Sequence, residues 1–182
     1  MKATGIVRRI DDLGRIVIPK EIRRTLRIRE GDPLEIFTEQ NGGVILKKYS
    51  PIGDLSTFAA QYADGLAAAS GSLVCVTDRD HIIAAAGTGK KNYEGKPISQ
   101  EMVRLIENRG SQVSDSQEKV CCKLTLDDNM SYQTQALSTI ISEGDAIGAV
   151  AFCSGELKGT VGELLEKLAQ AAAVFLAKQV EQ

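Results

Sequence analysis

DLGRIVIPKEIRRTL, which spans residues 12–26, decides the fold of the first fifty residues. Its run at 15–18, rich in β-branched residues, predicts a strand, and Pro19 ends that strand. Proline also suits the first turn of a helix, because its φ is already helical and its missing N–H is not needed there. We therefore expect a short helix over 20–26, directly after the strand.

A hairpin is predicted on each side of this helix. The alternating stretch 5–10 predicts a strand, and residues 11–14 carry turn chemistry. Two more strands are predicted over 34–38 and 44–48, because Asn41-Gly42-Gly43 between them is a hairpin signal. The expected order is strand, strand, helix, strand, strand.

This first module is too small to bury a sufficient core by itself. Its strands are nevertheless rich in Ile, Val and Leu, and exposed apolar strand edges promote aggregation. We therefore expect an obligate homodimer, in which two chains interleave their hairpins into one shared sheet system.

Charge is divided unevenly along the chain, whose net charge is −2. Residues 1–50 hold 11 basic and 7 acidic side chains, a balance of +4, and the remaining residues hold 11 basic and 17 acidic ones, a balance of −6. A basic first module on an acidic remainder is typical of a nucleic-acid-binding domain joined to a domain with another task.

The expected helix separates apolar from basic side chains. At about 100° per residue, Ile22 and Leu26 fall on one face, which we expect to be buried. Arginine's planar fork pairs with phosphate oxygens or with guanine edges, so clustered arginines indicate DNA binding; an ordinary solvated face is the alternative. The basic side chains opposite, and those on the preceding strands, are Lys20, Arg23, Arg24 and Arg27, with Arg8, Arg9 and Arg15.

The rest of the chain predicts a second domain over 56–182, joined by a linker at 51–55. A helical pattern begins at Leu55, and another helix begins near Ser99 with Gly110 as its terminator. Strands are predicted at 73–77, 81–86, around Val113, and at 120–124, 132–141 and 146–153.

A long helix is predicted from Val161 onward, with an apolar stripe close to a heptad seam. The stripe that begins at Leu55 is its expected partner. We therefore expect an antiparallel sheet whose first and last helices pack together. A bundle of these helices between chains would give a homotetramer.

The sequence offers little for catalysis or metal binding. His81 has no evident catalytic partner, and residues 87–91 lack the full phosphate-loop pattern. No catalytic residue, metal site or cofactor is therefore expected. The cysteines lack CxxC spacing and are expected to be buried reduced thiols: Cys75, Cys121, Cys122 and Cys153.

Nothing in the sequence suggests a membrane partner. No apolar run reaches the roughly 18 residues of a membrane span, and the start of the chain lacks the apolar core of a signal peptide. A cytoplasmic protein is expected.

The first module resembles the AbrB family of transition-state regulators. The resemblance is carried by TGIVR at 4–8, by the stretch 12–26, by EGD at 30–32 and by LEI at 34–36. It implies a swapped-hairpin dimer that binds double-stranded DNA. The DNA-binding residues it implies are Arg8, Arg15, Arg23 and Arg24. By their position in the chain, Lys2 and Arg9 are expected to be auxiliary phosphate contacts.

One position departs from the AbrB pattern. Many relatives have glycine directly after the helix, where this chain has Arg27. Glycine permits a left-handed cap at little cost. The role of Arg27 is therefore left open.

The second domain resembles a GAF domain, which implies a small-molecule pocket between the sheet and the elements over 87–133. Lys90, Lys91, Asp127 and Asp128 are polar groups for that region. The favoured interpretation of each of them is an ordinary solvated loop charge. No ligand-binding residue is assigned.

The predicted fold class is α+β, with a swapped-hairpin β-rich domain formed by dimerisation and a GAF-like antiparallel sheet flanked by helices. We expect a transcriptional regulator of sporulation genes whose GAF domain mediates oligomerisation and responds to a small-molecule effector. The alternative is an antitoxin that regulates its own toxin–antitoxin pair. An enzyme is not expected, because no nucleophile–base motif is present.

Overall fold

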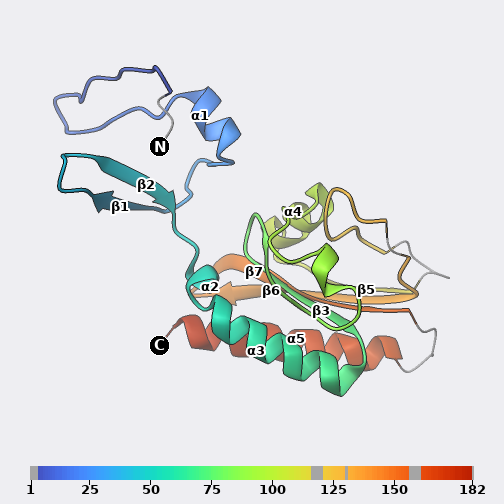
Figure 1. Cartoon of the computed structure of the whole chain (residues 1–182). Coiled ribbons are helices and arrows are strands. Elements are labelled where there is room, and N and C mark those ends of the chain that lie inside the picture. Colours follow the sequence, from blue (N-terminus) through green and yellow to red (C-terminus); the bar gives the residue numbers. More distant parts are fainter. Residues whose placement is uncertain (1–3, 116–120, 130, 156–160, 182) are drawn as a thin grey trace. The chain divides into compact units, whose positions relative to one another are not determined.

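The computed structural model describes residues 4–115, 121–129, 131–155 and 161–181 (Figure 1). The chain divides into two compact units, Met1–Tyr49 and Ser50–Gln182. We call the first unit the head and the second unit the body.

The head contains helix α1 (Lys20–Thr25) and strands β1 (Leu34–Thr38) and β2 (Val44–Lys48). The two strands pair antiparallel, from Leu34 opposite Lys48 to Thr38 opposite Val44. The predicted hairpin is confirmed. Its turn closes through a hydrogen bond of 2.8 Å from the Glu39 amide to the Gly43 carbonyl.

The predicted strands at 5–10 and 15–18 are not formed within this chain. The turn between them is present, because the Gly14 amide donates to the Asp11 carbonyl at 3.0 Å and Gly14 has a φ of +75°. An extended segment becomes a strand only when another strand accepts its hydrogen bonds. Among the described residues of this one chain, no strand does so.

The body is built on one antiparallel sheet with strand order β4-β3-β7-β6-β5. Its strands are β3 (Leu73–Thr77), β4 (Ile82–Ala86), β5 (Ser111–Asp115), β6 (Thr134–Ser142) and β7 (Asp145–Ser154). Its helical elements are α2 (Pro51–Asp54), α3 (Ser56–Ser70), the 3-10 turn η1 (Lys90–Asn92), α4 (Gln100–Glu107) and α5 (Val161–Val180).

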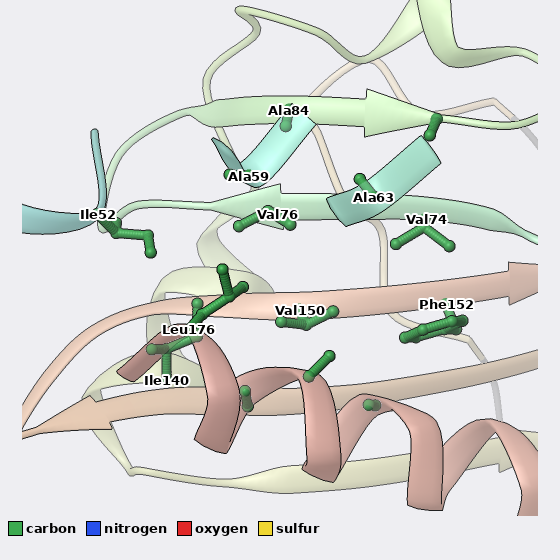
Figure 2. Close-up of a cluster of buried hydrophobic side chains, with 14 of the residues drawn as sticks. Ile52, Ala59, Ala63, Val74, Val76, Ala84, Ile140, Val150, Phe152 and Leu176 are labelled. Atoms are coloured by element: carbon green, nitrogen blue, oxygen red, sulfur yellow. The ribbon is translucent and has the colours of Figure 1, made fainter. Parts of the chain in front are cut away.

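Alternation along the strands sends side chains to two separate cores. On β3, Val74 and Val76 lie in the core beneath α3 and α5, whereas Leu73 and Cys75 lie in the core on the α4 side. Figure 2 shows the first of these cores, between the sheet and the two long helices. Helix α2 occupies most of the expected linker, and its Ile52 is fully buried in this same core.

The strand predicted at 120–124 is wrong for the residues that the structure describes. Residues 121–124 are irregular, and Val120 lies outside the described ranges. The Gln135 side chain, on β6, accepts from the Cys122 amide at 2.7 Å and donates to the Cys122 carbonyl at 2.8 Å. A side-chain amide therefore supplies the hydrogen bonds that a neighbouring strand would have made.

Helix α4 begins as predicted but ends differently. Ser99 is its N-cap and accepts from the Met102 amide at 3.1 Å. The helix ends at Glu107, and Arg109, not Gly110, takes the left-handed conformation with a φ of +53°. The Gly110 amide instead closes the cap by donating to the Leu105 carbonyl at 2.9 Å.

Candidate nucleic-acid interface

Helix α1 presents the basic side chains of the head. Pro19 precedes it with a φ of −57°, and Arg23 and Arg24 lie in its last turn, where cations interact favourably with the helix dipole. Arg24 is exposed and Arg23 is half-buried. Arg24 also lines a surface recess, together with Lys20, Glu21 and Thr25.

The expected buried stripe of α1 is not buried within this chain. Ile22 is half-buried, and Leu26 is 55% exposed. The prediction from the helical wheel is therefore wrong for a single chain. The physical reason is that no element of the head covers this face among the described residues.

The loop at 11–15 is organised around one carboxylate that the sequence analysis did not single out. Asp11 accepts from the Leu13 amide at 3.0 Å, from the Arg15 amide at 2.8 Å and from Arg15 Nε at 2.8 Å. The hydrogen bonds from Arg15 hold the pKa of the Asp11 carboxyl below its usual value. Asp11 therefore orients the Arg15 guanidinium, whose side chain is 69% exposed. An aspartate four residues before an arginine, across a glycine turn, is the signal for this arrangement.

The other predicted DNA-binding residues occupy separate places in the head. Arg8 and Arg9 lie on the exposed extended segment before the loop, and Arg8 donates to the carbonyl of its neighbour Val7 at 3.3 Å. Lys2 lies outside the described residues. Within the described ranges, the guanidinium groups of Arg9, Arg23 and Arg24 have neither a carboxylate partner nor a hydrogen bond.

A partly buried ion pair attaches the end of α1 to strand β2. The Asp32 side chain is only 2% exposed, and it accepts from Lys48 Nζ at 3.1 Å and from the Arg29 amide at 2.8 Å. Lys48 also donates to the Arg27 carbonyl at 3.0 Å. Lys48 of β2 and Asp32 thus fix the backbone just beyond α1. This fixes the position of the end of the helix that carries Arg23 and Arg24.

The head exposes an unusual amount of apolar surface for a folded unit. Val7 is 86% exposed and Val17 is 70% exposed. Large apolar side chains on soluble proteins are exposed singly, whereas contiguous groups mark interaction surfaces. The exposed large apolar side chains of the head are Ile6, Val7, Ile10, Leu13, Ile16, Val17, Leu26, Ile36, Phe37, Val44, Leu46 and Tyr49.

The body contains a buried polar cluster on the α4 side of its sheet. Tyr93 donates to Asp128 Oδ1 at 2.8 Å, the Leu124 amide donates to Asp128 Oδ2 at 3.0 Å, and the Tyr93 and Tyr132 hydroxyls are hydrogen-bonded. Burial raises the pKa of both tyrosines. Asp128 is the one buried member of the four polar residues considered for a pocket, because Lys90, Lys91 and Asp127 are exposed.

The cysteines of the body are free thiols, and three of them are buried, as expected: Cys75, Cys122 and Cys153. Cys121 is half-buried. The described residues contain no cluster of three or more His, Cys, Asp or Glu side chains suited to a metal ion. Within the described ranges, no helix combines the length and the hydropathy needed to traverse a lipid bilayer.

Comparison with known proteins assigns both units. Residues 54–181 match the family described as the stage V sporulation protein T C-terminal, transcription factor, and residues 7–54 match the MazE family of bacterial antitoxins. The transition state regulatory protein AbrB of Bacillus subtilis is 50% identical over 74 residues, which are 41% of this chain and 76% of AbrB. The body is similar in fold to the GAF domain region of a Geobacter sulfurreducens protein, with a TM-score of 0.56 and 16% identity over 72% of this chain and 95% of that domain.

These matches and the fold define a two-unit transcription regulator, with an AbrB-type head and a GAF-type body. The fold class predicted from the sequence is confirmed. Stage V sporulation protein T of Bacillus subtilis is 52% identical over 182 residues, the whole length of both proteins. The chain belongs to the stage V sporulation protein T family of transcription factors.

Proposed function

We propose that this transcription factor binds double-stranded DNA as a dimer, through arginines of two heads. The observation that carries the proposal is the set of guanidinium groups without protein partners among the described residues of the head, Arg9, Arg23 and Arg24. Arg15, which Asp11 orients, adds a fourth exposed guanidinium. Bidentate arginine–phosphate pairs form readily from such groups. Each neutralised phosphate also releases counterions.

The dimer follows from the apolar surface of the head. Burial of apolar area stabilises association by about 25 cal/mol per Å², and the head keeps Val7, Ile10 and Val17 at least 65% exposed. The extended segments around the 11–15 loop have unused backbone hydrogen-bonding capacity within this chain. The same segments of a second chain would bury these apolar side chains and pair with these backbone groups.

The experiment is a titration of fluorescent duplex DNA with the full chain at several salt concentrations. The double variant Arg23→Ala/Arg24→Ala removes four guanidinium groups from a dimer. We expect at least a tenfold loss of affinity and a salt slope that falls by about three to four, with unchanged circular dichroism. The matched control is Arg104→Ala, an exposed arginine on α4 of the body. Equal affinity of the double variant and the wild type would refute the proposal.

The body is proposed to join two dimers into a homotetramer through α3 and α5. These helices lie side by side, because Phe58 and Tyr62 of α3 contact Phe175 of α5 with ring centroids 5.9 and 4.9 Å apart. Helix α5 still exposes Leu164 by 56% and Val174 by 64%. A helix pair in which α5 keeps exposed apolar side chains is suited to packing against the same pair from another chain.

Sedimentation of a Val174→Glu variant tests the tetramer. Leu168 of α5 is half-buried against the body's own core, so its substitution would disturb the fold as well as the assembly. Val174 is exposed and avoids this ambiguity. We expect the variant to sediment as a dimer, with the melting temperature of the body changed little. A wild-type protein that is already dimeric would contradict the bundle.

The body is also proposed to bind a small-molecule effector near Tyr93, Asp128 and Tyr132. A buried carboxylate with two hydroxyls is a set of convergent polar groups in an apolar surround, which is typical of ligand sites. Calorimetry against a metabolite collection tests this, and Tyr132→Phe removes one hydroxyl at nearly constant volume. A hit whose affinity is the same for wild type and Tyr132→Phe would place the ligand elsewhere.

An antitoxin is the second candidate function, and the match of residues 7–54 to the MazE family favours it. That match covers the head and the first residues of the body. Against it, the chain beyond the head forms a sheet domain with two cores and matches a transcription-factor family over 54–181. Expression from the native locus, followed by purification, distinguishes the two functions. A stoichiometric toxin bound to the chain would favour the antitoxin.

A further inference from the structure

Arg27 has a backbone conformation that side chains other than glycine rarely adopt. Its φ is +53°, in the left-handed region, where the Cβ atom crowds the neighbouring carbonyl. Glycine avoids this crowding and is the usual residue at this position after a helix. The chain therefore retains an arginine where its backbone alone favours glycine.

Hydrogen bonds on both sides of Arg27 hold this conformation in place. The Arg27 amide donates to the Arg24 carbonyl at 3.3 Å, and the Ile28 amide donates to the Arg23 carbonyl at 2.7 Å. These two bonds form the paired cap that requires a left-handed residue between them. Lys48 Nζ adds a third bond, to the Arg27 carbonyl.

The Arg27 side chain makes no compensating contact among the described residues. It is exposed, and it has no hydrogen bond, ion pair or ring contact there. It follows Arg24 by three positions and Arg23 by four. Its guanidinium is therefore an additional cation on a backbone that the head holds rigidly, next to the basic end of α1.

We propose that Arg27 contacts a DNA phosphate and extends the interface beyond the end of α1. This inference rests on the proposed DNA binding by the head. A fixed backbone lowers the conformational entropy that the arginine loses on binding. Phosphate is the expected target, because a single exposed guanidinium on a cap attracts the regularly spaced backbone charges of the duplex.

The body contains a control site of matching geometry. Arg109 also has a φ of +53°, its amide donates to the Ile106 carbonyl at 3.0 Å, and the Gly110 amide donates to the Leu105 carbonyl at 2.9 Å. The Arg109 side chain is likewise exposed and without a partner among the described residues. The two arginines have the same type of helix cap, the same left-handed backbone conformation and an exposed side chain. They differ in that Arg27 lies in the head and Arg109 in the body.

The test compares Arg27→Gly with Arg109→Gly in the full chain, by DNA titration across salt concentrations and by thermal unfolding. Both substitutions relieve the same backbone strain, so neither is expected to lower the melting temperature. Arg27→Gly is expected to weaken DNA binding about fivefold to tenfold at 0.1 M salt and to reduce the salt slope by about two per dimer. Arg109→Gly is expected to change neither quantity. Arg27→Lys keeps the charge and is expected to retain the wild-type slope.

The outcomes separate this inference from the proposed function. If Arg23→Ala/Arg24→Ala loses affinity while Arg27→Gly binds with the wild-type affinity and slope, the Arg27 contact is refuted and DNA binding by the head stands. If wild-type protein ignores duplex DNA, the proposed function itself fails. A melting temperature that falls equally in both glycine variants, with DNA binding unchanged, would show that both arginines serve only the helix dipole.

Discussion

The head and the body use the same apolar residue types and complete their cores in different ways. In the body, Val74, Val76, Val150 and Phe152 are fully buried by helices of the same chain. In the head, Pro19 is the one buried residue among those described over 4–49. An apolar pattern therefore predicts that side chains are buried. It does not predict whether the same chain or a second chain buries them.

The largest expected difference between the two units concerns thiol chemistry, because every cysteine lies in the body. Burial, together with the nearby carboxylates of Glu101 and Asp128, raises the pKa of Cys122 to about 12 from an ordinary value of 9.0. At pH 8 this lowers the thiolate fraction about a thousandfold. Burial also raises the pKa values of Cys75 and Cys153. We expect these thiols to react with a disulfide reagent only when the body opens.

The same shifts predict how stability depends on pH. An unfolded thiol ionises near pH 9, whereas the folded one stays protonated, so the stability that burial gives below pH 9 is lost as the pH rises toward 12. Denaturant titrations between pH 7 and pH 10 measure the pH dependence of stability. Labelling of single-cysteine variants measures the reactivity of each thiol. Labelling of Cys75, Cys122 and Cys153 at the rate of a free thiol would contradict the prediction.

The next largest effect is expected from a glycine in the closed core of the body. A Cβ atom at Gly148, on β7, would meet the Thr77 carbonyl oxygen of β3 at 2.0 Å. Gly148→Ala therefore forces the two strands apart, at a cost of about 3 kcal/mol in the free energy of unfolding. Gly155, just beyond β7, has open space around its Cβ position. Gly155→Ala is the control, and calorimetry should show it within about 0.5 kcal/mol of the wild type.

Elements with local signals were predictable from the sequence. Pro19 before α1 and Asn41-Gly42-Gly43 before β2 act over a few residues, and the elements they bound were predicted within one residue. The strand predicted at 120–124 failed for a long-range reason, because the Gln135 side chain binds the backbone of Cys122. No local sequence pattern predicts which distant side chain will make the hydrogen bonds of a neighbouring strand.

The candidate interface was predictable to a similar degree. The clustering of arginines over 8–29 is a compositional fact, and it identified the basic surface of the head. The hydrogen bond from Arg15 to Asp11 depends on the geometry of a turn, and the left-handed backbone of Arg27 depends on how α1 ends. The sequence shows where the charges lie along the chain, whereas the folded structure determines which side chains are held by a partner and which are not.

A third prediction tests whether the open core of the head is closed by another chain. Val17 is 70% exposed, so Val17→Asp should be almost neutral in a lone chain. In a shared core the same change removes apolar burial and buries a charge, which costs at least about 2 kcal/mol. Leu126→Asp in the body, at a residue 54% exposed, is the control and should be nearly neutral. Thermal unfolding at two protein concentrations measures both, and a neutral Val17→Asp would mean that the head is not closed by a partner.

The smallest expected effect is a gain in the hairpin between β6 and β7. Ser142 pairs with Asp145, and the two residues between them, Glu143 and Gly144, have φ values of +48° and +87°. Two positive values define the turn in which asparagine, rather than glutamate, is favoured at the first position. Glu143→Asn is therefore expected to stabilise the body by roughly 0.5–1 kcal/mol, read from the denaturant midpoint.

Glu143→Gln removes the same charge without the turn preference, so an equal gain in that variant would assign the effect to charge instead of backbone conformation. The gain from Glu143→Asn should appear in the unfolding of the body and leave the concentration-dependent unfolding of the head unchanged. This asymmetry follows because the turn is completed within one chain. A shift in both transitions would show that the two units unfold together. Unfolding experiments could then not distinguish a core that one chain completes from a core that two chains share.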